Sequence, residues 1–236
     1  NYWGYTRGFY FAPKESYCAT KEPDREFRDM IRALHKAGIE CLMEMYFPKG
    51  TPSLQMIRSL WFWKLYYHVD GFHLLGDGVQ QDVIEHDPIL YGTKKLFSNV
   101  SGEADAENML AEYNAGFMLD MRRFLKSDEG MISGAEFHVR RNTGNFGTVN
   151  YMATQDGFTL YDTVSYNYRH NEANGEDNRD GSEFNYSWNC GVEGSTRKTA
   201  VRRMREQQMR NAFLMLLLSQ GTPMIYGGDE FANSQA

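Results

Sequence analysis

The chain has 236 residues, of which 42% are hydrophobic and 14% aromatic, and this composition indicates a globular protein rather than a disordered one. A net charge of −6 argues against nucleic acid or an anionic membrane as a partner, and no apolar run is long enough to predict a membrane-spanning helix. The three cysteines lack metal-ligand spacing and predict ordinary thiols in a reducing, cytoplasmic compartment, although the sequence starts inside a motif and its natural beginning is open.

Helical and strand-like patterns alternate along the first part of the chain. Between Asp24 and Lys36 apolar residues fall at i, i+3, i+4 and i+7 from Phe27, which predicts a helix. Aromatic residues crowd the next predicted helix, for which we expect Thr51 as the cap and core packing as their role. The elements expected after Lys36 are a strand at 39–47, a helix at 52–67, and strands at 68–75 and 95–100.

The second half continues the alternation. Polar-faced helical spacing predicts a helix from Asp105 to Lys126, and a short apolar run predicts a strand from Val149 to Ala153. Thr199 to Ser219 is expected to be helical, and Met224 starts a last strand. Helices that alternate with strands indicate an α/β protein with parallel strands.

A long loop follows the strand at 149–153. It interleaves aromatic residues, from Phe158 to Trp188, with many Asn, Gly and charged residues. Disordered segments are poor in aromatics, so an ordered, functional loop is expected. Carboxylates, amides and aromatic faces together are suited to binding a sugar, which offers hydroxyl groups and flat C–H faces.

This loop resembles the debranching branch of the α-amylase family, glycoside hydrolase family 13, which holds isoamylases, glycogen-debranching enzymes and type I pullulanases. The matching sequence motifs are "Asp-Gly-Phe-Thr-Leu", "His-Asn-Glu-Ala-Asn-Gly-Glu" and "Ser-Trp-Asn-Cys-Gly-Val-Glu-Gly", between Asp156 and Gly194. The opening "Asn-Tyr-Trp-Gly-Tyr" and the closing "Gln-Gly-Thr-Pro-Met" with "Gly-Asp-Glu" are similar to the family as well. One departure is Gln155, where the family has histidine.

The resemblance implies a (β/α)8 barrel whose chemistry lies at the carboxyl ends of the strands. Only about six strands are counted, since the first and most of the second would precede Asn1. We therefore expect residues 1–236 to form a single domain that is a partial barrel or a fragment of a longer protein. The short connection from Pro48 to His68 implies that the family's lid domain is absent or reduced.

The family's two catalytic carboxylates have no counterpart in the matching motifs. Where the family has "Asp-Gly-Phe-Arg-Phe-Asp", this chain has Asp70 to Leu75, so leucine stands at the nucleophile position and His73 at the arginine position. Asn99 stands where the family has its acid, and the third-strand Asn and His are also missing after Glu44. Leucine cannot attack an anomeric carbon and an amide cannot protonate a leaving oxygen.

Neighbouring carboxylates are an alternative source of this chemistry. Asp77 lies two residues past Leu75, which is roughly 6–7 Å along a strand and too far for aligned attack. Gly76 and Gly78 also predict that the strand has already ended. Glu103 on a loop is the other candidate, to replace Asn99.

The resemblance implies four binding residues. Tyr5 matches the tyrosine that lies under the sugar ring, and Asp156 matches the family's third, transition-state carboxylate, with Gln155 and His73 beside them. Asp156 is equally suited to stabilise a turn before Gly157, and His73 to be a hydrogen-bonded histidine at the barrel mouth. Residues with an expected structural role are His170, Asn171 and Glu172 in the loop, Asp229 and Glu230 at the rim, and the basic run 197–205 on a solvated helix face.

Three functions remain open. The leading hypothesis is an inactive relative of debranching enzymes that binds an α-glucan or maltooligosaccharide, or serves as a scaffold, and associates with another chain or domain that completes the barrel. The second is an active hydrolase or transglycosylase with relocated carboxylates, and the third is a structural remnant that binds no sugar. No motif predicts a metal, a cofactor or nucleic-acid binding.

Overall fold

The computed structural model describes the whole chain except residues 1–4, 6–7, 103–104, 173–174, 176 and 236. The chain divides into two compact units. Unit 1 comprises Asn1–Tyr113 with Gly144–Gly147, and unit 2 comprises Asn114–Thr143 with Thr148–Ala236. The expectation that residues 1–236 act as a single domain stays a prediction.

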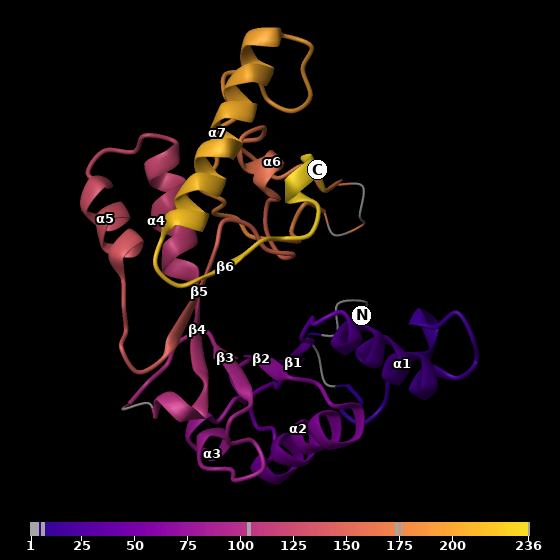
Figure 1. Ribbon diagram of the computed structural model, residues 1–236. Coiled ribbons are helices and arrows are strands. Elements are labelled where there is room, and N and C mark those ends of the chain that lie inside the picture. Colours follow the sequence, from indigo (N-terminus) through magenta and orange to yellow (C-terminus); the bar gives the residue numbers. More distant parts are fainter. Residues whose placement is uncertain (1–4, 6–7, 103–104, 173–174, 176, 236) are drawn as a thin grey trace. The chain divides into compact units, whose positions relative to one another are not determined.

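Unit 1 contains parallel strands that are neighbours in chain order. The strands are β1 (Leu42–Tyr46), β2 (Gly71–Leu75), β3 (Lys94–Phe97) and β4 (Leu110–Asn114, whose last residue opens unit 2). The helices of unit 1 are α1 (Pro23–Lys36), α2 (Ser53–Tyr67) and α3 (Gln81–Glu85), with 3-10 turns at Glu15–Tyr17 and Ala106–Asn108. Figure 1 shows α2 and α3 on the same side of these strands.

Aromatic side chains of α1 and α2 build the unit 1 core. Trp63 and Tyr67 are buried, and the ring of Phe27 lies edge-on to both, with centroids 5.4 and 5.0 Å apart. Burial of one such large apolar side chain stabilises the fold by about 1.5–3 kcal/mol. The expectation that these aromatics form a core is therefore confirmed.

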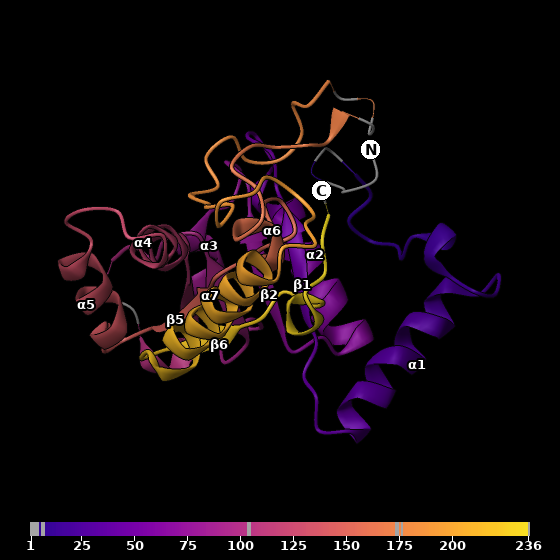
Figure 2. The ribbon, with the colours of Figure 1, turned by 90° about the horizontal axis from the view of Figure 1, so that it is seen from above.

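Unit 2 pairs β5 (Gly147–Tyr151, whose first residue belongs to unit 1) with β6 (Thr222–Met224), again in parallel. Its helices are α4 (Ala115–Leu125), α5 (Ile132–Arg140), α6 (Leu160–Thr163) and α7 (Thr199–Leu218), with a 3-10 turn at Asp229–Phe231. Figures 1 and 2 show α4 and α7 side by side. Buried Phe117 and Met121 of α4 and Ala212 and Leu216 of α7 belong to one core cluster.

The α/β class with parallel strands is confirmed, and three local predictions are wrong. The helix expected from Asp105 to Lys126 is instead a 3-10 turn, then β4, then α4. Thr51 does not cap α2, because its hydroxyl donates to the carbonyl of Pro48 at 2.7 Å. The last strand lies at Thr222–Met224 rather than from Met224 onward.

The connection between β1 and β2 consists of α2 and short turns, as expected for a reduced lid. In the part of the chain that the structure describes, every helix is too short or too polar to cross a membrane.

Candidate functional site

The two faces of the unit 1 strands differ in chemistry. The register of β1 and β2 pairs Met45 with Leu74 and Glu44 with His73. Because successive side chains point to opposite faces of a strand, Met45 and Leu74 share one face, which lies in the apolar core. Glu44 and His73 share the other face, so the fold places a carboxylate and an imidazole next to each other.

Glu44 joins two of the predicted binding residues. The hydroxyl of Tyr5 donates to Oε1 of Glu44 at 2.5 Å, and Nδ1 of His73 lies 2.9 Å from Oε2. The ring of Tyr113 from β4 stacks on the His73 ring with centroids 4.1 Å apart. We call Tyr5, Glu44, His73 and Tyr113 the Glu44 cluster. It combines a carboxylate, an imidazole and two tyrosine rings, which is the kind of side-chain set that binds carbohydrate.

His73 is the most buried residue of the Glu44 cluster. Only 9% of the residue is exposed, and its Nε2 atom is buried without a hydrogen-bond partner. The expectation of a hydrogen-bonded histidine is confirmed by the contact with Glu44. Its role in binding substrate stays a prediction.

Sequence analysis did not single out Glu44 or Tyr113. The only signal for Glu44 was its position at the start of the third-strand motif, where the family has aspartate. No local pattern marks Tyr113. The segment that contains it was predicted to be a helix, whereas the structure shows strand β4.

Leu75 and Asn99, which the motifs predict to stand at the nucleophile and acid positions, carry no carboxyl group, and their assignment to these positions stays a prediction. Leu75 ends β2 and is partly buried, and Asn99 is exposed in the turn after β3. Asp77 is exposed in a turn beyond the end of β2, as the glycines around it predicted. Glu103, the other alternative carboxylate, lies outside the described residues.

The remaining predicted residues lie in unit 2, in the turn that follows β5. Asp156 is exposed and Gln155 is partly exposed. The carboxylate of Asp156 accepts a hydrogen bond from the hydroxyl of Thr154, and its backbone carbonyl accepts one from the amide of Ser182 at 3.2 Å. These contacts fit a turn-stabilising role, while the sugar-binding role of Asp156 and Gln155 stays a prediction.

Arg122 of α4 holds the start of the loop after β5. It is buried and donates to the carbonyls of Met152 at 2.7 Å, Asn185 at 2.9 Å and Phe158 at 3.0 Å. Burial lowers the pKa of Arg122 to about 10. The buried Asp229 accepts a hydrogen bond from the amide of Leu160 at 2.8 Å, which agrees with its expected structural role, and burial raises its pKa.

Glu193 organises the far part of the same loop. Its carboxylate accepts from the amides of Asn167 and Tyr168, from the side chain of Asn189, and pairs with Nε2 of His170 at 2.9 Å. Although burial raises the pKa of Glu193, the hydrogen bond from Asn189 and those from its other partners lower it to about 2. The expected bracing role of His170 is confirmed.

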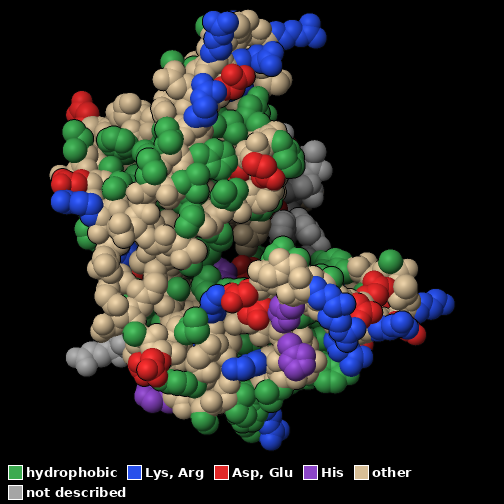
Figure 3. Space-filling view, in the orientation of Figure 1, with side chains coloured by type: hydrophobic (Ala, Val, Ile, Leu, Met, Phe, Trp, Pro, Cys, Tyr) green, Lys and Arg blue, Asp and Glu red, His purple; other side chains and the backbone are tan. Residues whose placement is uncertain are grey.

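The basic run at 197–205 is only partly a solvated helix face. Figure 3 shows Lys and Arg side chains gathered around the first turns of α7, where Arg202 and Arg203 are exposed. Arg205 is the exception, because it is buried and donates to the carbonyls of Asn189 at 3.1 Å and Val192 at 2.5 Å. The prediction is therefore wrong for Arg205, which holds the loop rather than facing solvent.

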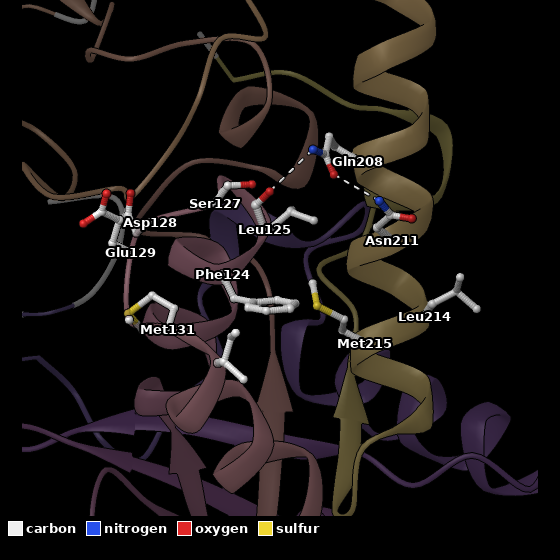
Figure 4. A pocket seen from close by; sticks show the side chains of 12 residues that line it. Phe124, Leu125, Ser127, Asp128, Glu129, Met131, Gln208, Asn211, Leu214 and Met215 are labelled. Carbon is white, nitrogen blue, oxygen red and sulfur yellow. Dashed lines mark hydrogen bonds between the residues drawn. The ribbon is translucent and has the colours of Figure 1, made fainter.

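A groove of about 650 Å³ lies in unit 2 between the end of α4 and α7. Figure 4 shows Phe124 and Met215 facing it, with Gln208 donating to the carbonyl of Leu125 and Asn211 donating to Gln208. None of the residues predicted to bind sugar lines this groove. Within the described residues, no group of three or more His, Cys, Asp or Glu is placed to hold a metal ion.

Curated relatives align with the whole length of the chain. It is 30% identical over 314 aligned residues to the glycogen operon protein GlgX homolog of Mycobacterium tuberculosis, which covers 100% of this chain and 43% of that protein. The GlgX homolog of Haemophilus influenzae is also 30% identical, over 316 residues, and the alignment covers 100% of this chain and 47% of that protein. Isoamylase SU1 of Zea mays is 28% identical over 334 residues, and the alignment covers 100% of this chain and 42% of that protein. The chain belongs to the debranching branch of the α-amylase family.

This debranching-family chain spans less than half the length of the curated relatives it matches. Their alignments extend over more positions than its 236 residues, so the relatives carry segments that it lacks. No family model matches the chain.

Solved structures confirm the fold. A pullulanase from Paenibacillus barengoltzii in complex with maltohexaose and α-cyclodextrin matches with a TM-score of 0.67 at 17% identity, over 99% of this chain and 45% of that one. The catalytic module of the pneumococcal glycogen-degrading factor SpuA matches with a TM-score of 0.62 at 18% identity, over 98% and 40%. The debranching-family chain therefore has the barrel-type α/β fold that the motifs implied.

Proposed function

We propose that this domain binds α-glucan chains and does not cleave their glycosidic bonds. The observation that carries the proposal is the identity of two residues, Leu75 and Asn99, at the positions that match the nucleophile and the acid. Retaining glycosidases need two carboxyl groups about 5–5.5 Å apart, and neither position has one.

The side chains of the Glu44 cluster and the names of the relatives support glucan binding. The Glu44 cluster brings two tyrosine rings, a carboxylate and an imidazole together where β1 and β2 pair. The relatives are glycogen-operon proteins and isoamylases by name, and a pullulanase of the same fold was solved with maltohexaose. A glucan is therefore the ligand class that we propose for this chain, with Tyr5 and His73 as contact residues of unit 1. Gln155 and Asp156 are separate candidates in unit 2.

Two measurements on the full natural protein test the proposal together. Calorimetric titration with maltoheptaose should show saturable binding, and a reducing-end assay with glycogen and pullulan should show no release above a blank. A ligand present at one hundred times its dissociation constant should also stabilise the fold by about 2.7 kcal/mol. Unchanged thermal stability with maltoheptaose would favour the structural remnant instead.

Release of reducing ends would favour the alternative of an active hydrolase or transglycosylase with relocated carboxylates. Asp77 and Glu103 are the residues to substitute in that case, singly and together, by the corresponding amides. Association with another chain or domain that completes the barrel, and a cytoplasmic location, stay predictions. Size-exclusion chromatography with light scattering on the natural protein tests the association.

A further inference from the structure

We propose that Nε2 of His73 is a hydrogen-bond acceptor that receives a hydroxyl group of the bound ligand, with Glu44 as the positioning residue that fixes this tautomer. The inference rests on the proposed glucan-binding function and specifies what the ligand must offer. It starts from the contacts of one carboxylate.

The contacts of Glu44 determine which ring nitrogen of His73 carries the proton. A carboxylate only accepts hydrogen bonds, and the tyrosine hydroxyl donates to one of its oxygens. Nδ1 of His73 lies 2.9 Å from the other oxygen and must therefore donate an N–H group. In a neutral imidazole the second nitrogen, Nε2, then carries a lone pair and no proton.

That lone pair has no partner among the described residues. Nε2 of His73 is buried and makes no hydrogen bond. Most buried polar atoms in folded proteins are paired, and one left unpaired destabilises the folded state. A donor that arrives with a ligand removes this penalty, so the site favours a ligand that supplies an O–H group.

The same arrangement selects the chemical class of the ligand. A lone pair cannot bond an ether or carbonyl oxygen, because neither provides a proton. The carboxylate of Glu44 on the neighbouring strand disfavours an anionic group such as a sugar phosphate. A neutral carbohydrate with a free hydroxyl meets both requirements.

Access to Nε2 involves the tyrosine beside it. Tyr113 lies flat against His73 at 4.1 Å, with 29° between the ring planes, and the exposed fraction of the His73 side chain is 11%. Because Nε2 itself is buried, a ligand hydroxyl reaches it only if a neighbouring side chain shifts. We expect the ring signals of Tyr113 to change when the ligand binds.

Nitrogen-15 NMR of the full natural protein with labelled histidine tests the tautomer directly. We expect Nδ1 of His73 to have the chemical shift of a protonated ring nitrogen and Nε2 to have that of an unprotonated one. Maltoheptaose should move the Nε2 signal, and per-O-methylated maltoheptaose, which has no hydroxyl donor, should not. The Glu44→Gln substitution should raise the fraction of the tautomer protonated at Nε2, an effect that a merely structural glutamate would not produce.

Affinity provides the second readout. His73→Phe should weaken maltoheptaose binding about tenfold, whereas His86→Phe at an exposed histidine should leave it unchanged. The NMR arm needs no substitution of His73 and keeps the inference testable if His73→Phe does not fold. Binding that leaves the Nε2 signal unmoved, or an Nε2 that carries the proton, overturns the inference while the proposed function stands. Absence of any maltoheptaose binding overturns both.

Discussion

Nε of Arg122 donates to the carbonyl of Met152 at 2.7 Å, and this bond ties α4 to the chain just after β5. The same guanidinium reaches the carbonyls of Phe158 and Asn185. One side chain therefore fixes three points of the segment that contains Asp156, even though Arg122 comes thirty or more positions earlier in the chain.

Arg122→Met should lower the free energy of unfolding by about 3 kcal/mol, because three buried carbonyls lose their donor. Urea unfolding followed by circular dichroism measures the change. Arg123→Met is the matched control, since Arg123 is partly exposed and pairs with Asp128 near the surface at 3.3 Å. Its effect should stay below about 1 kcal/mol, and equal losses in the two variants would contradict the assignment.

The loop around Glu193 should loosen in acid. Its folded pKa of about 2 lies below the unfolded value near 4.3, so its contribution to stability is complete above the unfolded pKa and is lost as the pH falls from about 5 toward 2. The difference in free energy of unfolding between the natural protein and Glu193→Gln should therefore be larger at pH 7 than at pH 3. Glu206→Gln, at an exposed position on α7, should show little difference at either pH. A constant gap for Glu193→Gln would rule the explanation out.

Gly76 allows the chain to turn at the end of β2. Its φ is +98°, and an added Cβ would lie 2.3 Å from the carbonyl oxygen of Phe47. Gly76→Ala should destabilise the protein by more than about 2 kcal/mol, from backbone strain and the clash together. Gly92→Ala controls for strain alone, because Gly92 has a φ of +70° and open space around its Cβ position. Thermal unfolding of both variants should rank Gly76→Ala as the less stable, and the reverse order would refute the steric argument.

Tyr5 should contribute to glucan binding mainly through its ring. Tyr5→Ala is expected to weaken maltoheptaose binding about 5- to 30-fold, the effect of losing an aromatic contact of about 1–2 kcal/mol. Tyr5→Phe keeps the ring and should lose less, although it removes the hydrogen bond to Glu44. Tyr17→Ala, at an exposed tyrosine, is the control. Titration calorimetry that finds all three variants equal to the natural protein would exclude Tyr5 from the site.

Local sequence patterns determined the elements whose hydrophobic period is clear. The stripe that starts at Phe27 predicted α1, and the helix expected from Thr199 to Ser219 is α7. The family motifs determined the fold class, and they also carry the prediction that Leu75 and Asn99 replace the two catalytic carboxylates.

Tertiary structure decided what local patterns could not. β4 reads Leu-Ala-Glu-Tyr-Asn, which contains good helix formers, but Lys95 of β3 pairs with Leu110 and makes the segment a strand. Glu44 and His73 are 29 positions apart and meet only because β1 and β2 pair in that register. Arg205 stands in a run of exposed basic residues, and only the loop folded against α7 buries it. Sequence fixes which groups the chain carries, whereas pairing and burial between distant segments decide which of them meet.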